Sequence, residues 1–315
     1  MSILVTGAAG FAGSHLLDLL SSQGADIVAW HRPGADVPDR RDGVRWQAVD
    51  MTDAASVTEA VGAISATEVY HCAGESHVSR SNQHTTSTYE INVRGTHYLV
   101  EALRRAGVRA RVVVPSSAMV YESSGDAMTE EHPLVPRGAY AVSKLAQEMT
   151  ALRAREDGLR VTVARAFNHV GPRQDPFFAA SGFARRIADI ETGKWEPEIA
   201  VGNLDARRDI HDVRDTVRAY QLILERGADG RAYNVCSGRA IQIGALLDKL
   251  LARARVPIKV RVDPARYRPN DVPLLLGDPT RLTKELGFLP QISLDQTIDD
   301  LLAYWRRRSA SPSIA

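Results

Sequence analysis

Cysteine is scarce in this 315-residue chain, and neither charge is in excess. The two cysteines, Cys72 and Cys236, lie in apolar runs, where small buried thiols are common and metal ligands rarely come singly. We therefore expect core thiols, no metal site and a reducing compartment. Lys and Arg total 39 against 38 Asp and Glu, so the chain has no overall field that would gather nucleic acid or an anionic membrane. Any anionic ligand must be bound by local groups.

The beginning of the chain lacks a long hydrophobic run. Its apolar start at 1–5 is interrupted at once by Thr6 and glycines, so it matches neither a signal peptide nor a membrane-spanning helix. We expect a cytoplasmic protein with no membrane partner.

The first half of the chain alternates short β-branched runs with amphipathic stretches. The strands that this pattern predicts lie at 3–5, 27–30, 44–49, 68–71, 111–115 and 160–166. Such alternation is typical of a parallel sheet covered by helices on both faces. We predict an α/β protein with a doubly wound parallel Rossmann sheet and a smaller, mixed C-terminal substrate-binding domain.

The alternation of predicted strands and helices ends after about Asn168. Longer segments rich in Gly, Pro and Arg come next, followed by a predicted helix at 212–225 and a strand at 232–236. The second half is therefore expected to interleave with the first. We predict a dinucleotide-binding domain at 1–167, to which 207–236 returns, and a substrate-binding domain formed by 168–206 and 237–315.

A glycine triplet follows the first predicted strand and opens a helix. Gly7 permits the tight turn, Gly10 lets the backbone approach a pyrophosphate, and Gly13 lets the new helix pack on the sheet. The amino terminus of that helix then faces negative charge. Its place directly after a strand makes a dinucleotide site more probable than a purely structural turn.

The second strand ends on Arg32, where a protein that binds NAD normally has an acidic residue for the ribose. A guanidinium there suits a 2′-phosphate, so we favour NADP(H), with NAD as the other possibility. A solvated loop charge is the alternative interpretation of Arg32. Asp50, followed by Met51 after the third strand, is placed to contact the adenine edge or is an ordinary turn residue.

Tyr140 and Lys144 are four residues apart in a predicted helix, so their side chains emerge on one face. A phenol with an ordinary pKa near 10 is a poor base at neutral pH, and a neighbouring ammonium lowers that pKa. Ser117 follows an apolar run at the carboxyl end of a strand, where its hydroxyl can hydrogen-bond a substrate oxygen. These three residues can handle a proton on a carbinol or ketone.

With these motifs the chain resembles the extended short-chain dehydrogenase/reductase family over essentially its full length. The matching segments are Gly7-Ala8-Ala9-Gly10-Phe11-Ala12-Gly13, His71-Cys72-Ala73-Gly74, Asn92-Val93-Arg94-Gly95-Thr96 and Tyr140-Ala141-Val142-Ser143-Lys144. The resemblance implies that Ser117, Tyr140 and Lys144 are catalytic. It further implies a homodimer and a cofactor site that includes Phe11, Ala73, Gly74, Asn92, Tyr140, Lys144 and Phe167.

The second half is similar to GDP-6-deoxy-4-keto-mannose reductases and GDP-mannose 4,6-dehydratases. The segments that carry this similarity are 167–172, 201–204, 207–209, 233–238 and 268–273. It implies that a nucleoside diphosphate sugar, with GDP favoured, is the substrate. The implied substrate-binding residues are Asn168, Arg208 and Arg268 for the diphosphate, Asp271 for a ribose hydroxyl, and Ser76 and Ser117.

The reaction depends on the two residues after Ser117. Dehydratases of this family place an acid and base pair there, whereas Ala118 and Met119 can neither give nor take a proton. Known reductases often keep an acid in that place, so the chain departs from them as well. The segment 116–121 is also similar to nucleotide-sugar 4-epimerases, and 74–78 to dTDP-glucose 4,6-dehydratases.

We predict an NADPH-dependent reductase of the 4-keto group of a nucleotide-linked 6-deoxy sugar. A 4-epimerase with tightly bound NAD is the alternative, and a 4,6-dehydratase is less favoured. A non-catalytic dinucleotide sensor ranks below these, because both Tyr140 and Lys144 are present.

Overall fold

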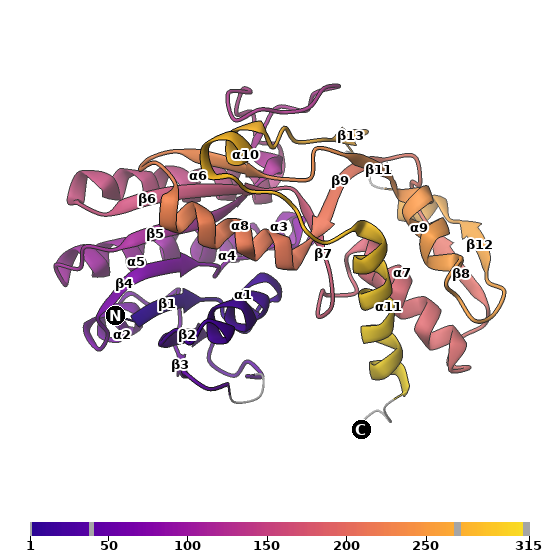
Figure 1. Ribbon diagram of the computed structural model, residues 1–315, viewed down its shortest axis with the longest axis horizontal. Helices are drawn as coiled ribbons and strands as arrows, with labels where there is room; N and C mark the ends of the chain where they lie inside the picture. Colours follow the sequence, from indigo (N-terminus) through magenta and orange to yellow (C-terminus); the bar gives the residue numbers. More distant parts are fainter. Residues whose placement is uncertain (1, 38–40, 268–271, 311–315) are drawn as a thin grey trace.

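The computed structural model describes residues 2–37, 41–267 and 272–310. Its larger part is a seven-stranded, all-parallel sheet in the order β10-β6-β5-β4-β1-β2-β3 (Figure 1). The strands are β1 (Ser2–Thr6), β2 (Ile27–His31), β3 (Val44–Ala48), β4 (Ala66–His71), β5 (Arg111–Ser117), β6 (Arg160–Ala166) and β10 (Ala232–Val235). This arrangement confirms the predicted Rossmann fold.

Helices cover both faces of this sheet. One face carries α2 (Ala54–Gly62), α5 (Gly95–Arg105) and α6 (Gly138–Arg153), and the other carries α1 (Phe11–Ser22), α8 (Val213–Arg226) and α10 (Thr280–Leu286). Successive strand residues point to opposite faces, so Val112 and Val114 of β5 join the first core while Val113 joins the second. Because both sides of the central strands β1, β2 and β5 are mostly buried, these strands are largely apolar.

Several short elements connect the larger ones. The segment between β4 and α5 contains α3 (Val78–Gln83), α4 (Thr85–Tyr89) and a π-helical turn, η1 (Glu90–Arg94). Single 3₁₀ turns follow at η2 (Ala118–Val120), η3 (Ala154–Asp157) and η4 (Pro264–Arg266).

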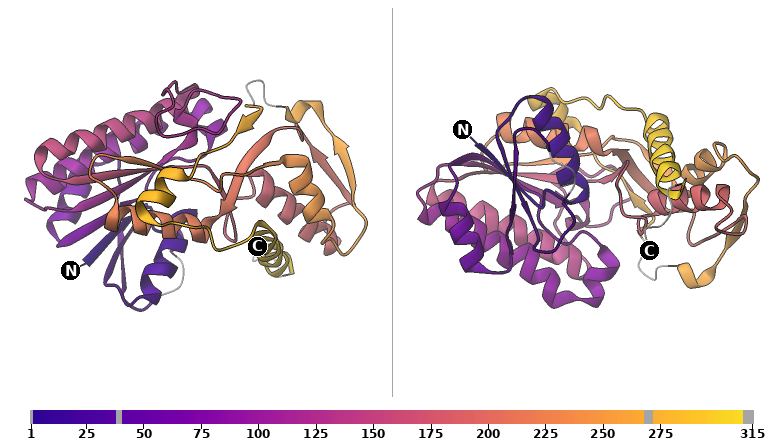
Figure 2. Two further views of the ribbon diagram at one scale, coloured as in Figure 1. Left: turned by 45° about the horizontal axis from the view of Figure 1, so that its top comes forward. Right: turned by 90° about the horizontal axis from the view of Figure 1, so that it is seen from below.

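A second, smaller part lies to one side of the large sheet (Figures 1 and 2). Its four-stranded sheet is mixed, since β9 pairs in parallel with β7 and β13 but antiparallel with β11. The elements are β7 (Asn168–Val170), α7 (Ala179–Glu191), β8 (Glu198–Val201), β9 (Arg207–Asp212), β11 (Ala240–Gln242), α9 (Ile243–Leu251), β12 (Lys259–Val262), β13 (Leu274–Leu275) and α11 (Leu294–Ala310). Strands β8 and β12 form a separate parallel pair.

The chain passes between the two parts more than once. Helix α8 and strand β10 belong to the large part, within the predicted return at 207–236, whereas β9 at 207–212 pairs inside the smaller sheet. The passage occurs at Asp212, which ends β9 and caps α8 by accepting a hydrogen bond from the Arg214 backbone N–H at 2.7 Å. The return to the large part therefore begins at α8.

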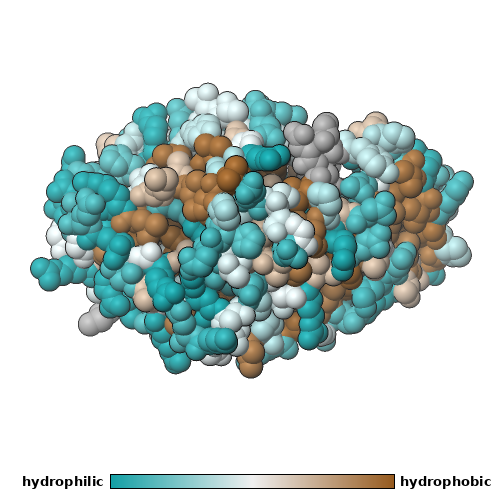
Figure 3. All heavy atoms as spheres, turned by 90° about the horizontal axis from the view of Figure 1, so that it is seen from above, coloured by the Kyte–Doolittle hydropathy of each residue, from teal (hydrophilic) through white to brown (hydrophobic). Residues whose placement is uncertain are grey.

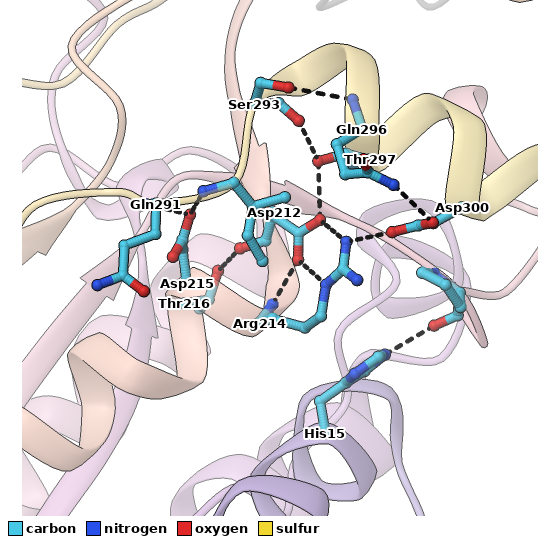
Figure 4. A network of polar contacts seen from close by, with 12 residues as sticks. His15, Asp212, Arg214, Asp215, Thr216, Gln291, Ser293, Gln296, Thr297 and Asp300 are labelled. Carbon is cyan, nitrogen blue, oxygen red and sulfur yellow. Dashed lines mark hydrogen bonds and ion pairs between the residues drawn. The ribbon is translucent and has the colours of Figure 1, made fainter.

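A buried polar network joins the start of α8 to α11 (Figure 4). The fully buried Asp212 carboxylate accepts bonds from the Arg214 guanidinium at 2.7 and 2.8 Å and from the Thr297 hydroxyl at 2.7 Å. Asp215 is equally buried and accepts the backbone N–H groups of Gln291 and Ile292 at 3.0 and 2.9 Å. Two carboxylates on one helix turn thus hold the segment that leads into α11.

Within the described ranges, no helix is both long enough and apolar enough to cross a membrane. The face seen from above is mostly hydrophilic, with its apolar residues in separate patches (Figure 3).

Candidate active site

The candidate site lies at the carboxyl ends of β1 and β4, where the strand order of the large sheet reverses. Open parallel sheets bind ligands in the crevice at such a point, because connections leave the two strands in opposite directions. The glycine turn after β1, the segment 72–74 after β4 and the end of β5 all converge there.

The glycine turn has the geometry that a dinucleotide phosphate site needs. Gly7 has φ 63°, and a Cβ there would lie 2.6 Å from the Ala73 backbone nitrogen. A Cβ on Gly13 would lie 2.3 Å from the Gly7 carbonyl oxygen, so only glycine lets α1 begin so close to the turn. Gly10 caps α1 without a side-chain hydrogen bond, which leaves the first N–H groups of the helix available for an anion. These residues fit a bound pyrophosphate.

At the far edge of the crevice, Arg32 is exposed just after β2. It lies close enough to Asp50 to contribute to a lowered pKa of that carboxyl, whose main cause is hydrogen bonding by the Thr52 side chain and backbone. Met51 is buried beside them. Neighbouring Phe11 begins α1 and stacks on His169, with ring centroids 5.6 Å apart.

Ser117 and Tyr140 meet in the crevice. Ser117 ends β5, and its hydroxyl hydrogen-bonds Tyr140 while accepting the Met119 backbone N–H at 3.2 Å. We expected the ammonium of Lys144 to lower the pKa of Tyr140, but burial raises that pKa instead. The bond from Ser117 opposes the rise, and the Glu75 carboxylate adds to it. The phenol is therefore protonated at neutral pH and can serve as an acid.

Lys144 lies one turn after Tyr140 on α6 and is buried. Its ammonium donates to the Pro115 carbonyl oxygen at 2.6 Å and to the Gln147 side-chain oxygen at 2.5 Å. Burial lowers the pKa of Lys144 to about 8, against the opposing effects of Glu148 and Cys72. The amine thus remains largely charged at neutral pH.

Asn92 supports the loop after β4 and the helix that carries Tyr140. Its side-chain oxygen accepts the Glu75 backbone N–H at 2.8 Å, and its amide donates to the Ser143 hydroxyl at 2.9 Å. Asn92 is fully buried in the π-helical turn η1, a type of distortion that is common at functional sites. A Cβ on Gly74 would lie 2.8 Å from the same Asn92 oxygen, so this loop needs glycine there.

The predicted substrate residues lie on both sides of the crevice. Asn168 begins β7 and donates to the Asp209 carbonyl oxygen at 3.3 Å, while Arg208 on β9 donates to the Val272 carbonyl oxygen at 2.6 Å. Ser76 is exposed in the loop after β4. Phe167 is buried at the end of β6. The predicted contacts Arg268 and Asp271 lie outside the described residues.

Asp209 is a site residue that sequence reasoning missed. Its buried carboxylate accepts the Ser237 backbone N–H and hydroxyl at 2.8 and 2.6 Å and the Gly238 N–H at 2.9 Å. It therefore fixes the loop after β10 next to Arg208 and Asn168. The feature of the sequence that points to Asp209 is its position directly after two arginines on one strand.

Two contacts tie the smaller part to the cofactor side of the crevice. His77, which is 8% exposed at the start of α3, packs 4.8 Å from the Phe178 ring and 3.6 Å from the Asp175 carboxylate. Arg173 adopts a left-handed backbone with φ 74° and pairs with Asp18 of α1 at 2.5 Å. A strained non-glycine residue at such a junction indicates that the surrounding structure holds it there.

The residues after Ser117 lack acid and base chemistry, as the sequence indicates. Ala118 is buried, and partly exposed Met119 packs against an apolar cluster with Val120 and Leu275. Among the described residues, no group of three or more His, Cys, Asp and Glu side chains is suited to hold a metal ion. The side chains that meet here, Ser117 and Tyr140, can hold and transfer a proton.

The Rossmann sheet, the glycine turn and the Ser, Tyr and Lys side chains define a short-chain dehydrogenase/reductase of the extended type. A family model described as GDP-mannose 4,6 dehydratase matches residues 4–301. The chain belongs to this family of nucleotide-sugar enzymes.

Similar proteins include reductases and epimerases. The chain is 34% identical to GDP-6-deoxy-D-mannose reductase of Pseudomonas aeruginosa, over 97% of each protein. The solved structure of RMD from Pseudomonas aeruginosa, complexed with NADPH, matches with a TM-score of 0.86 and 31% identity, over 98% of this chain and 100% of that one. A Thermus thermophilus UDP-glucose 4-epimerase in complex with NAD matches with a TM-score of 0.87 and 27% identity, over 97% and 99%.

Proposed function

We propose that the protein is an NADPH-dependent reductase of the 4-keto group of a GDP-linked 6-deoxy sugar. The observation that carries this proposal is the raised pKa of the partly buried Tyr140, together with the apolar residues Ala118 and Met119 directly after Ser117. A reduction needs one proton donor at the ketone oxygen, whereas a dehydration also needs an acid and a base beside the ring. The similarity to a GDP-6-deoxy-D-mannose reductase and to an NADPH-bound structure supports the same reaction.

In this proposal NADPH, when bound in the crevice, would supply the hydride that the C4 carbon of the sugar accepts. Tyr140 donates its phenolic proton to the C4 oxygen, and Ser117 hydrogen-bonds that oxygen as negative charge develops on it. Lys144 binds the nicotinamide ribose and holds positive charge beside the phenol. Asn168 and Arg208 bind the diphosphate, Arg268 is predicted to join them, and Asp271 is predicted to bind a ribose hydroxyl. Arg32 binds the 2′-phosphate.

The direct test is to incubate the purified protein with NADPH and GDP-6-deoxy-4-keto-mannose and to follow cofactor oxidation. We expect turnover by the wild type and a loss in kcat of about a hundredfold or more in Tyr140→Phe, because proton transfer from a positioned acid contributes that much. The variant should still bind NADPH, as measured by fluorescence. Absence of wild-type turnover, or equal rates for the two proteins, contradicts the proposal.

A 4-epimerase is the second candidate, supported by the likeness to the NAD-bound UDP-glucose 4-epimerase. An epimerase oxidises and then reduces the same carbon, so it keeps its cofactor through the cycle. It predicts NAD in the protein as purified and interconversion of two sugar nucleotides without added nicotinamide. Mass analysis of the cofactor released from the protein separates the two candidates.

The homodimer and the cytoplasmic location remain predictions. Helix α6 exposes two apolar side chains, with Val142 38% and Met149 64% exposed, and such residues on one helix suit a self-association surface. Light scattering of the purified protein tests the dimer.

A further inference from the structure

We propose that Gln147 and Thr96 are positioning residues that fix the Lys144 ammonium in the site through a buried chain of hydrogen bonds. The inference rests on the proposed role of Lys144 in hydride transfer. It adds two residues that were not among the predicted catalytic or cofactor-binding side chains and that act through Lys144 and Asn92.

The hydrogen-bond chain begins at the Lys144 ammonium, which can only donate. Its ammonium therefore fixes the orientation of the Gln147 amide, whose oxygen accepts at 2.5 Å. The amide nitrogen of Gln147 then faces the Thr96 hydroxyl oxygen and donates to it at 3.1 Å. Both Gln147 and Thr96 are fully buried, so neither bond is in competition with water.

Thr96 is the branch point of the chain. Its single hydroxyl proton goes to the Asn92 carbonyl oxygen at 2.6 Å, so its oxygen accepts from both Gln147 and the His71 Nε2 at 2.8 Å. His71 is thereby fixed as the tautomer with a proton on Nε2. Burial, reinforced by the charge on Lys144, lowers the pKa of His71 to about 3, which keeps the ring neutral.

The other end of the hydrogen-bond chain lies at the cofactor crevice. The unprotonated Nδ1 of His71 accepts from the Thr6 hydroxyl at 2.8 Å, and Thr6 accepts the Ala73 backbone N–H at 3.1 Å. Each bond along this path has a defined donor and acceptor, and the bonds that start at Lys144 and at Ala73 converge on the Thr96 hydroxyl. The Lys144 ammonium is therefore held in a fixed position relative to the ends of β1 and β4 and to the π-helical turn that contains Asn92.

Other titratable groups also surround Lys144, and an experiment must separate their effects. On its own helix these are Tyr140 and Glu148, and at the end of β4 they are His71 and Cys72. Glu148 is itself neutralised by Arg165 of β6 at 2.9 Å. Gln147 is uncharged. Replacing it with an acid should therefore raise the pKa of Lys144, and replacing it with an apolar residue should lower that pKa.

The chain offers a direct measurement because it has only five lysines, Lys144, Lys194, Lys249, Lys259 and Lys284. In protein labelled with ¹³C-lysine, the signal of Lys144 is assigned by its loss in Lys144→Arg and followed against pH. Gln147→Met removes an acceptor from the ammonium and should move its titration to lower pH. Gln147→Glu adds negative charge and should move it to higher pH.

Matched controls are Gln296→Met and Gln296→Glu on the exposed face of α11, which should leave the Lys144 titration unchanged. The other four lysine signals report whether each variant folds. If Lys144 titrates at the wild-type pH in both Gln147 variants, the proposal is wrong. This readout needs no substrate, so it stands even when the keto sugar is not turned over.

Kinetics supply the second arm. Thr96→Val leaves Gln147 without its acceptor and should lower kcat on the order of tenfold with little change in the KM for the sugar, while Thr96→Ser should restore the rate. The decline of activity at high pH should begin earlier in Gln147→Met and later in Gln147→Glu. Equal losses in Thr96→Val and Thr96→Ser would overturn the role of the hydroxyl.

Discussion

At the scale of single residues, Tyr140 shows how environment decides the role of a side chain. The same phenol acts as a base when charge lowers its pKa and as an acid when burial raises it. Here burial has the larger effect, and the ammonium of Lys144 is engaged with Pro115 and Gln147. The site therefore suits reduction of a ketone, in which the tyrosine gives its proton away.

Arg32 should determine the choice between the two nicotinamide cofactors. Arg32→Ala removes charge-assisted hydrogen bonds to a 2′-phosphate, so we expect the KM for NADPH to rise about tenfold or more and the KM for NADH to change little. Steady-state kinetics with each cofactor measure this. Arg45→Ala, which removes another exposed arginine from β3, is the control. An equal effect on both cofactors would mean that Arg32 is only a solvated loop charge.

Sequence reasoning reached the residues whose spacing along the chain carries the signal. Tyr140 and Lys144 share one helix, and Gly7, Gly10 and Gly13 share one turn, so local geometry brings each set together. The hydrogen-bond chain from Lys144 to His71 could not be predicted in this way. Thr96 and Gln147 are 51 residues apart, and only the packing of α5 against α6 joins them.

At the scale of elements, the first turn of α8 connects several parts of the fold. Asp212 ends β9, caps α8 and binds Arg214 and Thr297, so one carboxylate serves a strand, a helix start and a distant helix. The sequence predicted a helix beginning at 212, but not its tie to α11. That tie depends on Thr297, which is 85 residues further along the chain.

We expect Asp212→Ala to lower the free energy of unfolding by about 3 kcal/mol, because it removes one of the two acceptors of the buried Thr297 hydroxyl and leaves part of the Arg214 guanidinium unpaired. Urea unfolding followed by circular dichroism measures the change. Asp299→Asn is the matched control, since Asp299 is 55% exposed and its pair with Arg253 should contribute less than about 1 kcal/mol. Similar losses in the two variants would contradict the importance assigned to burial.

At the scale of the whole molecule, three buried histidines should make stability depend on pH. Burial lowers the pKa of His71 and His211 to about 3 and that of His15 to about 4. In the unfolded chain each regains a pKa near 6.5. Between these values the unfolded state binds more protons, so stability falls as the pH falls.

We therefore expect the free energy of unfolding to decrease from pH 7 to pH 5, by up to about 1.4 kcal/mol per pH unit for each of these histidines. Urea unfolding at pH 7, 6 and 5 measures the slope. His211→Gln should flatten it, whereas His97→Gln, on the exposed side of α5, should not. A slope of zero in the wild type would show that the folded protein binds these protons as readily as the unfolded chain.

The repeated passage of the chain between its two parts also limits how such enzymes can be recombined. The last strand of the large sheet, β10, is supplied by residues 232–235, long after the first excursion into the smaller part. A truncation after residue 167 would leave the backbone N–H and C=O groups on one edge of β6 unpaired and remove α8 from one face of the sheet. Substrate specificity therefore cannot be transferred by exchanging a contiguous C-terminal segment, because that segment also supplies the last strand and one covering helix of the large sheet.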